Sequence, residues 1–192
     1  MAVNLKVDLD RNKFSEILKK CSLLANDAEI NKAINRAAKR AADTAKAETV
    51  RQLSSEYTLP ASEIRGTIFA RNMGGGNVGA VMDISSSPFA LPKFKGVTPT
   101  EVMPPAKGPV HAKVKKSGGG TLKQAFVAKM KSGHVGVYER KDKKNLPIEQ
   151  NFGPSTTGMF KANETVSEAV MKLAGETFEK RVQHELARLF NG

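Results

Sequence analysis

A glycine-centred hairpin pattern late in the chain limits the possible folds more than any other feature of the sequence. Residues 125–131 alternate between the two sides of a strand, with the period of two that a half-buried strand shows. Ser132-Gly133 then allows a turn, and residues 135–140 resume the alternation. The pattern predicts a β-hairpin with one apolar face. Tyr138 and Arg140 are expected on the opposite face.

The residues after this hairpin predict an edge strand followed by a helix. Leu146-Pro147-Ile148 is a short extended segment, and its proline cannot donate a hydrogen bond to a central ladder, so we expect it at a sheet edge. Gly153-Pro154 ends the strand, and Ser155 or Thr156 can cap the next helix. The stretch is a structural signature and contains no catalytic set.

Two long helices are predicted from apolar positions that recur every three or four residues. The first runs from about Ala28 to Ser54, and its ridge of small side chains lets a neighbour approach closely. The second runs from about Lys161 to Phe190, and Met159 and Phe160 before it are expected to be core anchors. The ridge consists of Ile30, Ala33, Ile34, Ala37, Ala38, Ala41 and Ala45, and the second apolar face consists of Val166, Val170, Leu173, Phe178, Val182, Leu186 and Leu189.

The N-terminal part adds strands and a shorter helix. Residues 3–9 alternate as a strand, and Asp10 caps a predicted helix whose apolar stripe includes Cys21 as a buried small hydrophobe. Ser62–Arg65 is expected to form a short helical turn. Two strands, Thr67–Arg71 and Val78–Ile84, are joined across a triple glycine. We therefore expect an α+β fold, with a mixed or antiparallel sheet or a small sandwich, N-terminal helices and a long C-terminal helix, in one domain over residues 1–192.

The positive charge is concentrated in the middle of the chain. The net charge is +12, and Lys93–Lys144 holds thirteen Lys and Arg against three Asp and Glu. Residues 85–120 are rich in Pro, Gly, Ser and Lys, which predicts a basic extended loop with a single strand at Val110–Val114. Such a charge attracts polyanions and acidic protein faces. The candidate contacts to a partner or to DNA are Lys93, Lys95, Lys107, Lys113, Lys115 and Lys116.

The sequence gives no support for catalysis. The three histidines, His111, His134 and His184, lie far apart and lack the spacing of a metal site. Ser85-Ser86-Ser87 has no flanking glycines of a nucleophile elbow. We expect no enzyme activity, cofactor or metal. There is no apolar run long enough to span a membrane and no hydrophobic signal core, so we expect no membrane partner and a cytosolic protein until assembly.

Several of these segments occur together, in order, in a known family. The chain resembles the prophage minor tail protein Z family, the tail completion proteins of long-tailed phages. The resemblance covers most of the chain and lies in Ala33–Ala38, Tyr57–Pro60, Ala125-Phe126, Ser132-Gly133, Val137–Arg140, Leu146–Ile148 and Gly153-Pro154.

The resemblance implies a structural virion protein without an active site. Such a protein forms a homo-oligomeric ring, with six-fold symmetry by analogy, at the head-proximal end of the tail, where it completes the tail and helps join it to the head. Its implied neighbours are the tail terminator or tube, the head–tail connector and the DNA that passes through the channel. Its implied location is the virion, and the host cytoplasm during assembly.

A second hypothesis remains open from the residues alone. The central Lys-rich segment also suits a basic nucleic-acid-binding protein. Within the tail hypothesis, the same segment can contact DNA or an acidic ring partner. We favour the protein partner because aromatic residues that stack on bases are few and no base-reading motif is present.

Overall fold

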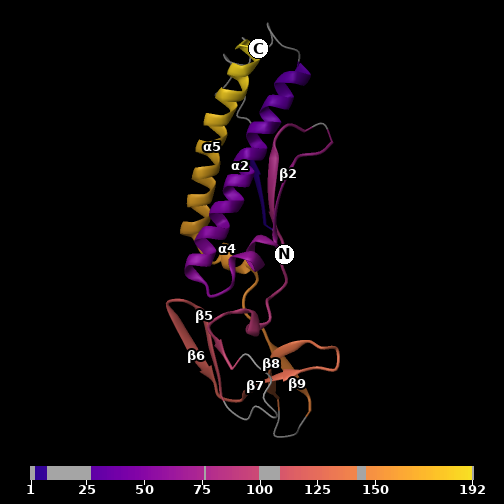
Figure 1. Ribbon diagram of the computed structural model, residues 1–192, viewed down its shortest axis with the longest axis vertical. Coiled ribbons are helices and arrows are strands. Elements are labelled where there is room, and N and C mark those ends of the chain that lie inside the picture. Colours follow the sequence, from indigo (N-terminus) through magenta and orange to yellow (C-terminus); the bar gives the residue numbers. More distant parts are fainter. Residues whose placement is uncertain (1–2, 8–26, 76, 100–108, 142–145, 192) are drawn as a thin grey trace.

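The structure, a computed structural model, describes residues 3–7, 27–75, 77–99, 109–141 and 146–191 of the 192-residue chain. Two halves are stacked end to end (Figure 1). The helical half contains the four described helices and one sheet, and the β half contains two further sheets. All three sheets are antiparallel, with three strands each. The predicted α+β class with its long C-terminal helix is confirmed.

The helical half is built in three layers. Helix α2 (Asp27–Glu56) lies between helix α5 (Glu164–Asn191), which runs in the opposite direction, and a sheet of order β1-β3-β2 (Figure 1). The strands are β1 (Val3–Val7), β2 (Ile68–Asn72) and β3 (Ala80–Ile84). Val3 and Ile68 both stand opposite Ile84, so these side chains share one face of the sheet with Leu5 and Met82, whereas Phe69 and Val81 lie on the other face. The face that includes Ile84 packs on α2.

The predicted small-residue ridge forms the seam between α2 and its neighbours. Every residue of the ridge is buried, and most of its alanines have no exposed surface. On α5 the predicted apolar face is buried at Val166, Val170, Phe178, Val182 and Leu186 and partly buried at the other two positions. Small side chains let the two helix backbones approach closely, which explains why so alanine-rich a helix has a buried face.

The β half holds two sheets that follow one another in the chain. The first has the order β4-β5-β6, and the second has the order β7-β8-β9. The strands are β4 (Val97–Thr98), β5 (Val110–Lys115), β6 (Gly118–Leu122), β7 (Ala125–Lys129), β8 (Val135–Arg140) and β9 (Ile148–Asn151). The short 3-10 helix η1 (Leu91–Lys93) precedes β4.

The predicted hairpin and edge strand are confirmed. Strands β7 and β8 pair in antiparallel register, with buried Val127 opposite buried Val137, and Gly133 takes a φ of 84° in the turn. On the other face the Phe126 ring lies 6.3 Å from that of Tyr138, and the Arg140 guanidinium lies 5.0 Å above Phe126. Strand β9 lies at the edge of this sheet, as the proline before it predicts.

The prediction of one extended arm over residues 85–120 is wrong for the described part of this segment. Phe94 is fully buried, and the segment contributes β4 and β6 in addition to the predicted β5. Gly118–Gly120, which lies within the predicted loop, pairs with β5 and places Gly120 opposite Ala112. A glycine-rich backbone can form ladder hydrogen bonds without side chains, so a pattern of apolar alternation does not detect it. Residues 100–108 and the predicted helix from Asp10, with Cys21, lie outside the described residues.

The chain leaves the helical half after β3 and returns at helix α4 (Thr156–Lys161). Ser155 caps α4 by accepting a hydrogen bond from the Gly158 N–H at 3.0 Å, as predicted, and Met159 and Phe160 are buried anchors. The predicted helical turn after Pro60 is helix α3 (Ala61–Arg65).

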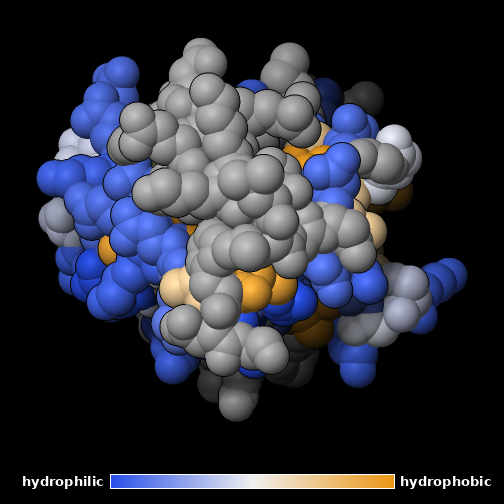
Figure 2. Space-filling view, turned by 90° about the horizontal axis from the view of Figure 1, so that it is seen from above, coloured by the Kyte–Doolittle hydropathy of each residue, from blue (hydrophilic) through white to orange (hydrophobic). Residues whose placement is uncertain are grey.

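The far end of the helical half, where α2 begins and α5 ends, is mostly hydrophilic among its described residues, with small apolar areas between them (Figure 2). None of the helices in the described part of the chain carries an apolar stretch sufficient to cross a membrane.

Candidate functional site

Lysines of the central segment converge on the end of helix α2. After α2 ends at Glu56, Tyr57 forms an isolated antiparallel bridge with Lys115. The Thr58 N–H then donates to the Val114 carbonyl at 2.9 Å. On the other side, the Lys95 N–H donates to the Thr58 carbonyl at 3.1 Å. These bonds bring two stretches of the basic segment to the same helix end.

A pocket of about 350 Å³ opens at this place, and we name it the lysine cleft. Three of the six predicted contact lysines line it, and none of its described lining residues is acidic. Its lining residues are Ser54, Tyr57, Thr58, Leu59, Pro60, Ala61, Lys95, Gly96, Lys113 and Lys116.

Lys116 has a structural role within the cleft. The last turn of α2 has no basic residue of its own. The Lys116 Nζ donates to the Ser54 carbonyl at 2.9 Å, and its main-chain N–H donates to the Glu56 carbonyl at 2.8 Å. Carbonyl oxygens at the end of a helix lack partners within the helix and carry partial negative charge. Lys116, the residue after β5, therefore supplies the cap that the helix sequence omits.

Two of the predicted contact lysines are held in ion pairs beside the cleft. The Lys115 Nζ lies 3.0 Å from the Glu56 carboxylate and 5.4 Å from the centre of the Tyr57 ring. The hydrogen bond to Glu56 raises the pKa of Lys115, and burial raises the pKa of Tyr57. The Lys93 Nζ lies 2.8 Å from the Glu63 carboxylate. Each of these lysines is balanced by an adjacent acid, so they are poor contacts for a polyanion.

Lys95 and Lys113 supply the available charge of the cleft. Neither ammonium group has a hydrogen-bonding or ionic partner among the residues that the structure describes. Lys113 is held by its backbone, because its N–H donates to the Gly96 carbonyl at 2.8 Å. A Cβ at Gly96 would lie 2.2 Å from the Lys113 oxygen, so only glycine fits there. Lys107, the sixth predicted contact, lies outside the described residues.

Sequence reasoning missed the other wall of the cleft. Residues 54–61 are distant in sequence from the basic segment, and Glu56 is their one charged residue, so no cluster of charge marks them as part of a site. The available signal was the Tyr57–Pro60 segment of the family resemblance, but nothing in the sequence connects it to the basic segment.

A second basic pocket, of about 420 Å³, lies between α2, α5 and β2. Two of its cations are balanced, with Arg36 at 2.7 Å from Glu185 and Lys39 at 2.6 Å from Asp43. Its lining residues are Arg36, Lys39, Arg40, Asp43, Asn72, Glu185 and Arg188.

The structure does not bring the histidines together. The His134 ring lies 2.9 Å from the Gln150 amide nitrogen, and the His111 ring lies 3.4 Å from the Thr121 hydroxyl. Over the described ranges, no group of three or more His, Cys, Asp or Glu is placed to hold a metal ion.

Comparisons with protein-family models, with curated proteins and with solved structures found no match to this chain.

Proposed function

We propose that this chain is a structural protein of a phage tail, a minor tail or tail completion protein that forms a homo-oligomeric ring at the head-proximal end of the tail. There it completes the tail and helps join it to the head. Its proposed neighbours are the tail terminator or tube and the head–tail connector. Its proposed location is the virion, and the host cytoplasm during assembly.

The proposal is supported by the positions that the segments of the family resemblance take in the fold, where they pack in the core or pair with other segments. Ala33–Ala38 contributes four buried residues to the α2 seam. Tyr57–Pro60 pairs with β5 and with Lys95 at the joint of the two halves. Gly153 lies against the Phe94 ring, where a Cβ would come within 2.3 Å. The shared residues therefore determine packing and backbone pairing, which supports a role in assembly over a role in a reaction.

The lysine cleft has a place in this proposal as a contact for an acidic surface of a neighbouring tail protein. Its two available ammonium groups, on Lys95 and Lys113, come from different segments that are fixed by backbone hydrogen bonds. Charge complementarity of this kind sets the orientation of partners and the rate of association.

The same two lysines favour one alternative, a basic nucleic-acid-binding protein. That function predicts a binding constant whose logarithm falls linearly with the logarithm of salt concentration, by about 0.9 for each phosphate neutralised on duplex DNA.

The first experiment is to measure the mass of the purified, nuclease-treated protein by light scattering at low and at high salt. A discrete oligomer that persists at high salt supports the ring. Mass that appears only when DNA is added supports the alternative and counts against the ring.

A pair of matched variants separates the two functions. Replacing Lys95 and Lys113 by Gln should lower the salt slope of duplex binding by about 1.8 if the cleft contacts phosphates. Replacing exposed Lys129 and Lys131 by Gln removes the same charge from the hairpin turn and serves as the control. An equal slope in both variants excludes the cleft as a phosphate site.

A further inference from the structure

In the described part of the chain, each of the two sheets of the β half has two outer strands. These are β4 and β6 in one sheet and β7 and β9 in the other, and two of them, β6 and β9, have the features of pairing edges described below. The β5–β6 side and the β7-β8-β9 sheet lie on opposite sides of the lower half of the molecule (Figure 1).

Two glycines of β6 have no explanation within the described chain. Neither Gly118 nor Gly120 has a positive φ, and a Cβ at either position would meet nothing within 4 Å. Gly119 differs, because its Cβ would lie 2.9 Å from that of Lys113. A glycine inside a strand costs about 0.5–1 kcal/mol relative to alanine. It often marks a place where another backbone approaches closely.

Strand β6 also lacks the features that prevent edge-to-edge pairing. Proteins usually protect an exposed edge with a charged residue, a proline or a cover. Within β6 there is no charged residue and no proline, and the three glycines are exposed. Its charges stand just outside it, at Lys116 and Lys123.

Strand β9 presents a complementary edge. Glu139 on β8 stands directly opposite Glu149 on β9, and like charges in this relation destabilise a sheet. Glu149 pairs with Lys141, but both side chains are more than half exposed, so this pair contributes little. Two large apolar side chains flank the strand, Leu146 and Phe152, and both are more than half exposed.

We propose that β6 of one subunit pairs with β9 of the next copy of this chain, so that a sheet continues across the contact. Lys123, which flanks β6, then lies near the Glu139–Glu149 pair, and the neighbour covers Leu146 and Phe152. A symmetric β6–β6 contact would instead place the flanking lysines of two copies together. Head-to-tail contacts between different surfaces generate rings when the rotation closes. The inference rests on the proposed ring and names the surfaces that build it.

Disulfide formation between subunits tests this contact. In a Cys21→Ser background, one preparation carries Gly120→Cys and a second carries Glu149→Cys or Gln150→Cys. Neighbouring positions on a strand face opposite sides, so one of these two shares the face of position 120. Facing residues on paired strands have Cβ atoms about 4.5–5.5 Å apart, near the range of a disulfide. Gly175→Cys replaces Gly120→Cys in the control, because Gly175 is an exposed glycine of α5 with equally open space.

The expected result is that mixing the two preparations gives a disulfide-linked dimer. Its yield should be at least about tenfold higher than in either preparation alone or in the control mixture. A tenfold difference corresponds to about 1.4 kcal/mol in the free energy of association. Efficient cross-linking of Gly120→Cys with itself would overturn the head-to-tail contact. The absence of a mixed disulfide at millimolar protein would also overturn this contact. That holds whether light scattering finds a ring or a monomer. If a ring forms but the mixed disulfide does not, the proposed function stands and the proposed contact does not. If mixed disulfides are found only in open filaments, the contact is supported and the ring is not.

Discussion

The Glu56 carboxylate, on the last residue of α2, accepts a hydrogen bond from the side chain of Asn163, the residue that caps α5. The Asn163 Oδ1 in turn accepts from the Val166 N–H at 3.2 Å, in the first turn of α5. The Lys115 ammonium, from β5, completes the set at 3.0 Å from Glu56. One carboxylate therefore joins the ends of both long helices to the β half.

Replacing Glu56 by Gln should lower the free energy of unfolding by about 1 kcal/mol, because the ion pair with Lys115 and a charge-assisted hydrogen bond are lost. Urea denaturation at pH 7 measures the change. Glu168→Gln, on an exposed site of α5, is the control and should change stability by less than about 0.5 kcal/mol. Equal losses in the two variants would show that Glu56 does not join the halves.

Gly153→Ala should destabilise the protein by roughly 1–3 kcal/mol, because the new methyl group would lie 2.3 Å from the buried Phe94 ring. Gly120→Ala meets open space at an ordinary φ, so it should be neutral or stabilise the subunit by about 0.5 kcal/mol. Thermal unfolding of both variants at one protein concentration checks the contrast. A stable Gly153→Ala protein would contradict the close packing of the joint.

Ala41→Leu should destabilise by roughly 1–3 kcal/mol, since Ala41 has no exposed surface in the α2 seam and a larger side chain must separate the helices. Ala47→Leu adds the same atoms on the exposed side of α2 and is the control. The urea midpoints of the two variants give the comparison. Tolerance of Ala41→Leu would mean that α2 and its neighbours are not tightly packed.

The sequence predicted the fold correctly where buried side chains recur with the period of the helix or strand that carries them. The ridge of α2, the apolar face of α5 and the β7–β8 hairpin all have side chains that repeat with the element. It failed at β6, where glycines leave no repeat, and at the wall of the lysine cleft. That wall depends on Thr58 pairing with Val114 and Lys95, which only long-range backbone contacts create. The lysines themselves were visible as charge, but their division between ion pairs and the cleft depends on the positions of Glu56 and Glu63.

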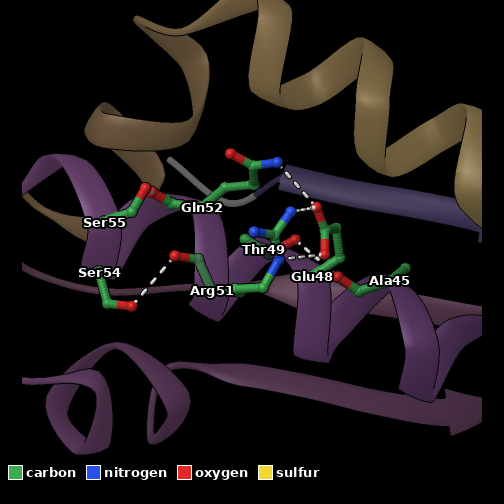
Figure 3. A network of polar contacts seen from close by, with 7 residues as sticks. All are labelled: Ala45, Glu48, Thr49, Arg51, Gln52, Ser54 and Ser55. Atoms are coloured by element: carbon green, nitrogen blue, oxygen red, sulfur yellow. Dashed lines mark hydrogen bonds and ion pairs between the residues drawn. The ribbon is translucent and has the colours of Figure 1, made fainter.

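The stability that Arg51 provides should depend on pH. Its guanidinium donates to Glu48 at 2.8 Å, beside a bond from Gln52 to the same carboxylate (Figure 3), and the hydrogen bond from Arg51 holds the pKa of Glu48 below its ordinary value. A carboxyl with a lowered folded-state pKa contributes stability above its unfolded pKa, near 4.3, and loses it as pH falls through the folded value. Arg51→Ala should therefore lower the urea midpoint slightly at pH 7 and progressively less as the pH falls below about 4.

Urea midpoints of wild type and Arg51→Ala, measured stepwise from pH 7 to pH 3, test this dependence. Arg181→Ala, on an exposed site of α5, controls for the loss of an arginine. A difference between Arg51→Ala and wild type that stays constant with pH would mean that Arg51 does not act through the ionised carboxylate.

The order of the elements along the chain has a consequence during translation. Helix α5, which covers the alanine seam of α2, leaves the ribosome after the whole β half has been made. At ordinary rates of synthesis the seam waits on the order of ten seconds without its cover. An uncovered stripe of leucines would be prone to aggregate in that interval. A stripe built mainly of methyl groups exposes little apolar surface, so the nascent helix can remain in water until its partner arrives.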